Sequence, residues 1–120
     1  MKKIIFALLL ILGITGYIYS QQPHRTPEER AQTTSIKLGK DLALTQDQIT
    51  NVYNADLTRN RAVEAARANN ASNKEAMHSQ VKAANESYDV QMKSILTPDQ
   101  YTQWKQLQEE QRAKAKEHRQ

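Results

Sequence analysis

The 120-residue sequence contains no cysteine, and only three glycines, three prolines and 6% aromatic residues. Without cysteine the chain has no disulfide framework, no thiol nucleophile, no cysteine-based metal site and no acylated lipoprotein cysteine. Glycine-rich phosphate loops and the Gly-x-Ser-x-Gly motif of hydrolases are missing too. The formal net charge of +4 is too small to predict nucleic-acid binding. The sequence therefore argues against an enzyme, and no cofactor is expected.

The first twenty residues have the pattern of a secretory signal peptide. Two lysines precede an apolar stretch over residues 4–14, and a polar segment follows. The apolar stretch is shorter than the roughly 20 residues needed to cross a bilayer, which favours a cleaved peptide over an anchor. We expect cleavage after Ser20 or, alternatively, after Gly16. The mature protein is then a single domain over residues 21–120, with no stable membrane insertion.

The mature sequence is typical of an all-α protein. Glycine and proline are absent between Gly39 and Pro98, where helix-forming residues dominate. Four segments place a Ser or Thr three residues before a Glu or Gln, which is the pattern of a helix capping box. They are Thr26 to Glu29, Thr45 to Gln48, Ser72 to Glu75 and Thr97 to Gln100. The predicted helices cover about 27–42, 46–70, 73–95 and 98–116, and the polar chain from Glu109 is expected to fray.

Apolar residues at helical spacing predict how these helices pack. The second and third helices have nearly equal lengths and should form an antiparallel hairpin, with Ile49 near Met92 and Tyr53 near Tyr88. The fourth helix has a short apolar face of Tyr101, Trp104 and Leu107. Large apolar residues are scarce, so the core is thin. This scarcity favours elongated antiparallel hairpins that a second copy completes as a dimer.

Two of the capping segments belong to a longer repeated pattern. Residues 44–48 and 96–100 both read Leu-Thr-x-Asp-Gln, and each is followed by an apolar residue. A leucine before the cap can pack on the fourth helical residue and so fix the angle at which the helix begins. The expected role of these positions is structural. They are Leu44, Thr45, Gln48, Leu96, Thr97 and Gln100.

With its signal peptide, all-helical domain and two Leu-Thr-x-x-Gln motifs opening the second and fourth helices, the sequence resembles the Spy/CpxP family of periplasmic proteins. The resemblance implies a thin, cradle-shaped helical homodimer in the periplasm of a Gram-negative bacterium. It also implies a chaperone of the envelope stress response that works without ATP. Such a protein binds unfolded or misfolded clients and suppresses their aggregation.

Client-binding residues are predicted from what a chaperone surface needs, which is flexible charge and adaptable apolar contacts. The candidates on the long hairpin are Arg59, Arg61, Arg67, Lys74, Lys82, Lys93, Met77 and Met92. The alternative is that both methionines fill the core and that the cations form a solvated face. Helical spacing offers these cations the partners Asp56 for Arg59, Glu64 for Arg67 and Asp89 for Lys93.

Two other functions compete with the chaperone. The protein could regulate by docking on the sensor domain of an envelope-stress kinase, which would use the same kind of surface. Relatives of the Spy/CpxP family also include zinc-responsive proteins, but His24, His78 and His118 are isolated from one another and from other ligands. No metal site is predicted.

Overall fold

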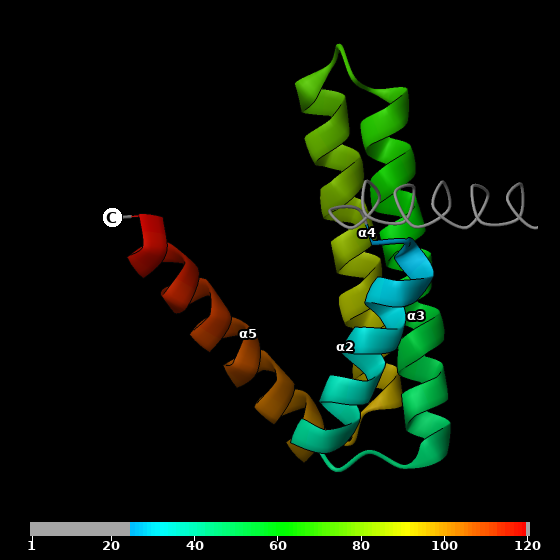
Figure 1. Ribbon diagram of the computed structural model, residues 1–120, viewed down its shortest axis with the longest axis vertical. Coiled ribbons are helices and arrows are strands. Elements are labelled where there is room, and N and C mark those ends of the chain that lie inside the picture. Colours follow the sequence, from blue (N-terminus) through cyan, green and yellow to red (C-terminus); the bar gives the residue numbers. More distant parts are fainter. Residues whose placement is uncertain (1–24, 120) are drawn as a thin grey trace, which may run out of the picture.

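The computed structural model describes residues 25–119, and this part of the chain forms four α-helices and no strand (Figure 1). They are α2 (Pro27–Asp41), α3 (Gln46–Asn69), α4 (Lys74–Ile95) and α5 (Pro98–Arg119). The expected all-helical class and the number of helices are confirmed. The predicted signal peptide lies outside the described residues. None of the helices in the described region has the length and apolar character needed to span a membrane.

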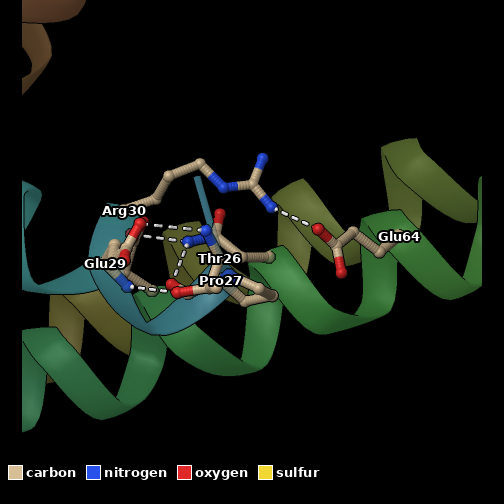
Figure 2. Close-up of polar contacts among 7 residues, drawn as sticks. Thr26, Pro27, Glu29, Arg30 and Glu64 are labelled. Atoms are coloured by element: carbon tan, nitrogen blue, oxygen red, sulfur yellow. Dashed lines mark hydrogen bonds and ion pairs between the residues drawn. The ribbon is translucent and has the colours of Figure 1, made fainter. Parts of the chain in front are cut away.

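Local hydrogen bonds explain where the helices begin. The Thr26 hydroxyl accepts from the Glu29 backbone N–H at 3.1 Å, and the Glu29 carboxylate accepts from the Thr26 N–H at 3.3 Å (Figure 2). Pro27 follows in the first helical position, where a missing N–H costs nothing. Helix α3 ends at Asn69, and α4 begins at Lys74, one residue later than the sequence predicts. Its cap is Asn73, whose side chain accepts from the Ala76 N–H, and not Ser72.

Small residues let α2 pack closely along α3. Ala31 and Ser35 are buried, and a Cβ added to Gly39 would lie 2.9 Å from the Ile49 side chain. Glycine at this position therefore reflects close helix approach rather than a turn.

Ion pairs near the start of α2 connect it to α3. Arg30 reaches across to Glu64 on α3 at 2.8 Å, as Figure 2 shows, and Arg61 pairs with Glu28 at 2.7 Å. The predicted pairing of Glu64 with Arg67 is therefore replaced by a contact between helices. Helical spacing had pointed to a neighbour on α3, whereas the structure brings a cation of α2 closer.

The long helices α3 and α4 form the expected antiparallel hairpin (Figure 1). Tyr88 of α4 lies against Arg59 of α3, whose guanidinium is 4.3 Å from the ring centroid. At the hairpin base, the side chain of Gln48 reaches the backbone of Ile95. Ile49 and Tyr53 line a hollow together with residues of α2, among them Gln32 and Ile36. The pairings of Tyr53 with Tyr88 and Ile49 with Met92 stay predictions.

The core lies at one end of the hairpin, where all four helices meet. It combines the end of α2, the start of α3, the end of α4 and the start of α5, and its buried members are Leu38, Leu42, Val52, Ala55, Tyr88, Met92, Leu96 and Trp104. The described part of the chain is accordingly long and thin, with extents of 66 × 41 × 31 Å. The hairpin tip, far from this core, carries mostly exposed side chains.

Helix α5 packs on the core only near its start and then leads away from the hairpin (Figure 1). Trp104 is buried, whereas every residue from Glu109 to Arg119 is exposed. The structure continues the helix to Arg119, beyond the predicted end near residue 116, and the fraying expected from Glu109 onward stays a prediction. Good helix formers such as Gln, Glu, Lys, Arg and Ala sustain it without tertiary contacts.

Candidate functional site: a paired helix corner and an open cleft

The two Leu-Thr-x-x-Gln motifs, 52 residues apart in sequence, meet in space. Each threonine hydroxyl accepts a hydrogen bond from its own glutamine N–H at 3.2 Å. In return, the side-chain oxygen Oε1 of each glutamine accepts from the backbone N–H of its threonine, at 2.9 Å for Thr45 and 3.0 Å for Thr97. Leu96 is buried and Leu44 is partly buried against the core. All six motif positions therefore contribute to the corners where α3 and α5 begin.

The glutamine amide nitrogens join the two corners to each other. Gln48 Nε2 donates to the carbonyl oxygen of Ile95, the last residue of α4, at 3.2 Å and to Gln100 Oε1 at 2.8 Å. Gln100 Nε2 donates to the carbonyl oxygen of Leu42, at the end of α2, at 3.3 Å. Carbonyl groups at a helix end have no partner within their own helix. Each glutamine thus caps the start of its own helix and the end of the helix that precedes the other motif.

A cleft of about 370 Å³ opens between α2 and α5, beside this paired corner. We call it the α2–α5 cleft. Its apolar lining is formed by Leu38, Tyr88, Trp104 and Leu107, and its uncharged polar lining by Thr33, Thr34, Gln108 and Gln111. Charges of both signs complete it, from Lys37, Asp41, Arg59, Glu110 and Lys114. The cleft therefore offers an apolar base with mixed polar walls.

The cleft base contains an ordered aromatic pair. The rings of Tyr88 and Trp104 meet edge to face, with centroids 5.7 Å apart. Burial, and to a smaller extent the charge of Asp56, raises the pKa of the Tyr88 phenol well above its usual range. Tyr88 is only 4% exposed, so its ring forms part of the solid apolar base of the cleft.

Behind the aromatic pair lies a buried carboxylate that holds Arg59 in place. Asp56 is completely buried and accepts from Arg59 Nη2 at 2.7 Å and from Asn60 Nδ2 at 3.0 Å. Asn60 also donates to the Pro27 carbonyl oxygen at 3.3 Å. The Arg59 side chain, 29% exposed, lies over the Tyr88 ring. The predicted Asp56–Arg59 pair is present, and it presents a guanidinium at the cleft.

A second polar cluster fixes the start of α5 on α4. The Tyr101 hydroxyl donates to both carboxylate oxygens of Asp89 at 3.1 Å, and Lys105 forms an ion pair with Asp89. Hydrogen bonding from Lys105 lowers the pKa of the Asp89 carboxyl, and the same contact raises the pKa of Lys105. Helical spacing predicted an ion pair between Asp89 and Lys93. In the structure Asp89 instead pairs with Lys105 of α5.

The predicted client-binding residues do not gather in one place. Arg59 lines the cleft, whereas Arg61 pairs with Glu28 and Lys82 lies 4.0 Å from Glu86. Exposed side chains elsewhere on the hairpin are those of Arg67, Lys74 and Lys93. Met77 is half-buried, and Met92 is completely buried in the core. Met92 therefore cannot contact a client from this surface, in agreement with the alternative that it fills the core.

The sequence did not identify most of the cleft lining as a site, because the spacing of these residues is also typical of an ordinary amphipathic helix. Trp104 and Leu107, for example, belong to the predicted apolar face of the last helix. One signal was available: the apolar face of α5 ends at Leu107, although the helix formers continue for about three more turns. Such a helix can pack on the core only near its start, so the rest of α5 projects and forms one wall of the cleft.

Metal ligands do not cluster in the part of the chain that the structure describes. Within residues 25–119 no three His, Asp or Glu side chains are placed to hold a metal ion. His78 and His118 are both exposed. His24 lies outside the described residues.

One protein family matches most of the chain. Its sequence profile, described as Domain of unknown function (DUF4890), covers residues 19–104. The match includes both corner motifs and ends at Trp104, before the projecting part of α5. No curated protein and no solved structure matches the chain.

Proposed function

The chain belongs to the DUF4890 family, and we propose that it is an ATP-independent periplasmic chaperone that holds segments of unfolded proteins in the α2–α5 cleft. The observation that carries this proposal is the open cleft itself, in which the core residues Leu38, Tyr88 and Trp104 form the base. Leu107 is the partly exposed apolar side chain of the cleft, and charges of both signs border it. Unfolded chains expose apolar side chains next to polar backbone, and this lining offers partners to both.

The mixed lining suits weak and general binding rather than one tight ligand. Apolar contacts provide affinity for any exposed hydrophobic side chain. Lysine and glutamine side chains on the walls, such as Lys37, Lys114, Gln108 and Gln111, are long and can adapt to different sequences. Arg59, held by Asp56, adds a fixed cation that can contact carboxylates or aromatic rings.

The resemblance to the Spy/CpxP family supports the same proposal. The residues that carry it, Leu-Thr-x-x-Gln at 44–48 and 96–100, build the paired corner beside the cleft. The proposal retains the homodimer and the cradle shape that this resemblance implies. Light scattering coupled to size-exclusion chromatography of the mature chain, residues 21–120, tests the dimer, and a monomeric mass would contradict it.

An aggregation assay tests the function. The mature chain is mixed without ATP, at increasing ratio, with two unrelated denatured proteins, and light scattering is recorded. Dose-dependent suppression for both proteins is expected. If neither is protected at a severalfold molar excess, the chaperone proposal fails, and capture of one dominant partner from envelope extracts would instead indicate a regulator that docks on a sensor kinase.

A matched pair of variants tests the place of binding. Leu107→Ser removes an apolar side chain from the cleft, and Val90→Ser removes one that is 70% exposed on α4 and lies outside the cleft lining. Suppression should weaken for Leu107→Ser and persist for Val90→Ser, with thermal melting of both variants recorded to exclude unfolding. Equal suppression by the two folded variants would contradict binding in the cleft.

A further inference from the structure

Among residues 25–119, three capping boxes differ in their third helical residue. The helix that begins after Thr26 uses Glu29 as the third helical residue, whereas the two corner motifs use Gln48 and Gln100. Glutamate and glutamine both serve a capping box, since either supplies the oxygen that accepts from the cap N–H. Glutamate also interacts favourably with the positive end of the helix dipole. Capping alone therefore gives no reason for glutamine at the two corners.

The amide nitrogen supplies the reason. At both corners the oxygen of the glutamine side chain serves the capping box, and the nitrogen donates to a carbonyl oxygen at the end of another helix. The Glu29 carboxylate has no such nitrogen, and none of the other described helices ends beside the start of α2 (Figure 1). Glutamine is therefore used where two corners must be joined.

The bond from Gln100 to Leu42 connects the two walls of the cleft. Leu42 terminates α2 and Gln100 lies in the first turn of α5, so this hydrogen bond ties the base of one wall to the base of the other. Gln48 reinforces it by donating to Gln100 Oε1, which holds the Gln100 amide in the orientation that points its nitrogen at Leu42. Beyond this base, the exposed part of α5 has little contact with the rest of the described structure.

We propose that Gln48 and Gln100 are positioning residues that set the angle between α2 and α5 and so the width of the α2–α5 cleft. The consequence for client capture rests on the proposed function, whereas the control of cleft width does not. A small change at the corner has a large effect at the rim. Ala115 lies about 25 Å along α5 from its start, so a rotation of about 10° at the corner displaces it by about 4 Å.

Gln100→Glu is the sharpest test, because it replaces the nitrogen by an oxygen and keeps the length of the side chain and the oxygen that accepts in the capping box. The new carboxylate can still accept from the Thr97 N–H and from Gln48 Nε2, so the capping box is retained. Only the donation to the Leu42 carbonyl oxygen is lost, and a carboxylate oxygen then faces that carbonyl. Gln48→Glu is the second variant, and Glu29→Gln is the matched control, since it makes the reverse exchange between the same two residue types in the capping box that joins no corners.

The cleft width can be measured directly because the chain has no cysteine of its own. Cysteines are introduced at the exposed positions Thr33 on α2 and Ala115 on α5, spin labels are attached, and the distance between them is measured by pulsed electron paramagnetic resonance without any client. We expect the mean distance to shift by about 4 Å or more, with a broader distribution, in Gln100→Glu and Gln48→Glu. Glu29→Gln should match the parent protein.

Unchanged distance distributions in both folded corner variants would overturn the inference, as would an equal change in Glu29→Gln. If one corner variant does not fold, as judged by circular dichroism, the other decides the result. The same proteins are then compared in the aggregation assay. A corner variant with a shifted distance should suppress aggregation less than Glu29→Gln does. If the parent protein suppresses nothing, the proposed function fails while the distance measurement still decides the role of the two glutamines.

Discussion

At the scale of single residues, Ala43 occupies a position that favours glycine. Among the described residues, Ala43 is the one non-glycine residue with a positive φ, which is 51°. It follows the C-cap of α2, and the Leu44 N–H donates to the Gly39 carbonyl oxygen at 3.0 Å, as in a Schellman motif. An alanine Cβ is strained in this left-handed conformation. The corner before α3 therefore contains a local cost that its other contacts offset.

Ala43→Gly should consequently stabilise the protein. Relief of the strained conformation is expected to raise the free energy of unfolding by about 1 kcal/mol, less the entropy that glycine adds to the unfolded chain. Ala65→Gly, at an exposed position inside α3, is the control and should lower stability by about 1 kcal/mol. Urea denaturation followed by circular dichroism measures both. A destabilised Ala43→Gly variant would show that the strain is not real.

The two corner threonines provide a second prediction at this scale. Thr45→Ala and Thr97→Ala each remove a hydroxyl that accepts a backbone N–H, and each should cost about 0.5–2 kcal/mol of stability. Thr58→Ala is the control, because its hydroxyl donates only to the Asn54 carbonyl oxygen within α3. That change should be neutral or slightly stabilising, since alanine is the better helix former. Melting temperatures that do not separate the two classes would contradict a capping role.

Predictability from sequence follows the range of the interaction. The caps at Thr26, Thr45 and Thr97 were predicted because both partners lie within four residues of each other. The cap of α4 was misplaced because Ser72 and Asn73 are adjacent and both are good N-cap residues. The bonds from the Gln48 and Gln100 nitrogens depend on the meeting of residues about fifty positions apart, and no local pattern reports such an encounter.

At the scale of helices, the junction between α4 and α5 depends on Asp89. This carboxylate pairs with Lys105 and accepts from the Tyr101 hydroxyl, and it is a main polar contact between the two helices. The hydrogen bond from Lys105 is the main reason that the pKa of Asp89 lies below its usual value near 3.8. A carboxyl whose pKa is lower in the folded state favours folding while it is ionised. Its contribution is thus complete above about pH 4 and is lost as the pH falls through the lowered pKa.

The junction should therefore loosen in acid, and Trp104 can report it. Trp104 is the sole tryptophan of the chain and lies next to Tyr101 and Lys105. Its fluorescence and the stability of the parent protein should change together as the pH falls below about 4. In Asp89→Asn this part of the pH dependence should disappear, whereas Asp47→Asn, on the first turn of α3, should retain it. An identical acid profile for Asp89→Asn and the parent would contradict the role of Asp89.

Helix packing shows a second limit of sequence reasoning. The apolar stripes of α3 and α4 correctly indicated a hairpin, but they do not define its register, because such stripes can slide by one turn and still match. The contact of α2 with α3 depends on small residues, Ala31, Ser35 and Gly39, which carry little hydrophobic signal. The projection of α5 was visible only indirectly, in an apolar face that stops at Leu107.

At the scale of the whole molecule, the core and the proposed binding cleft extend in different directions. The core gathers at the paired corner, whereas the cleft extends outwards along α5 to Lys114. Residues 109–119 are exposed, and the family match ends at Trp104. A helix held only at its base adds little to the core but supplies one wall of the cleft. The outer part of α5 is thus where a change should separate the proposed binding function from folding.

Deletion of residues 109–120 separates these two roles. The shortened chain keeps Trp104 and Leu107, so its melting temperature should stay close to that of the parent, as expected for the loss of exposed residues. Its suppression of aggregation should fall, because Glu110, Gln111 and Lys114 no longer border the cleft. A control in which residues 115–120 alone are removed keeps all three wall residues and should retain suppression. If both shortened proteins suppress aggregation as well as the parent does, clients do not bind along α5, and the exposed apolar side chains of Ile36 and Val90 become the surface to test next.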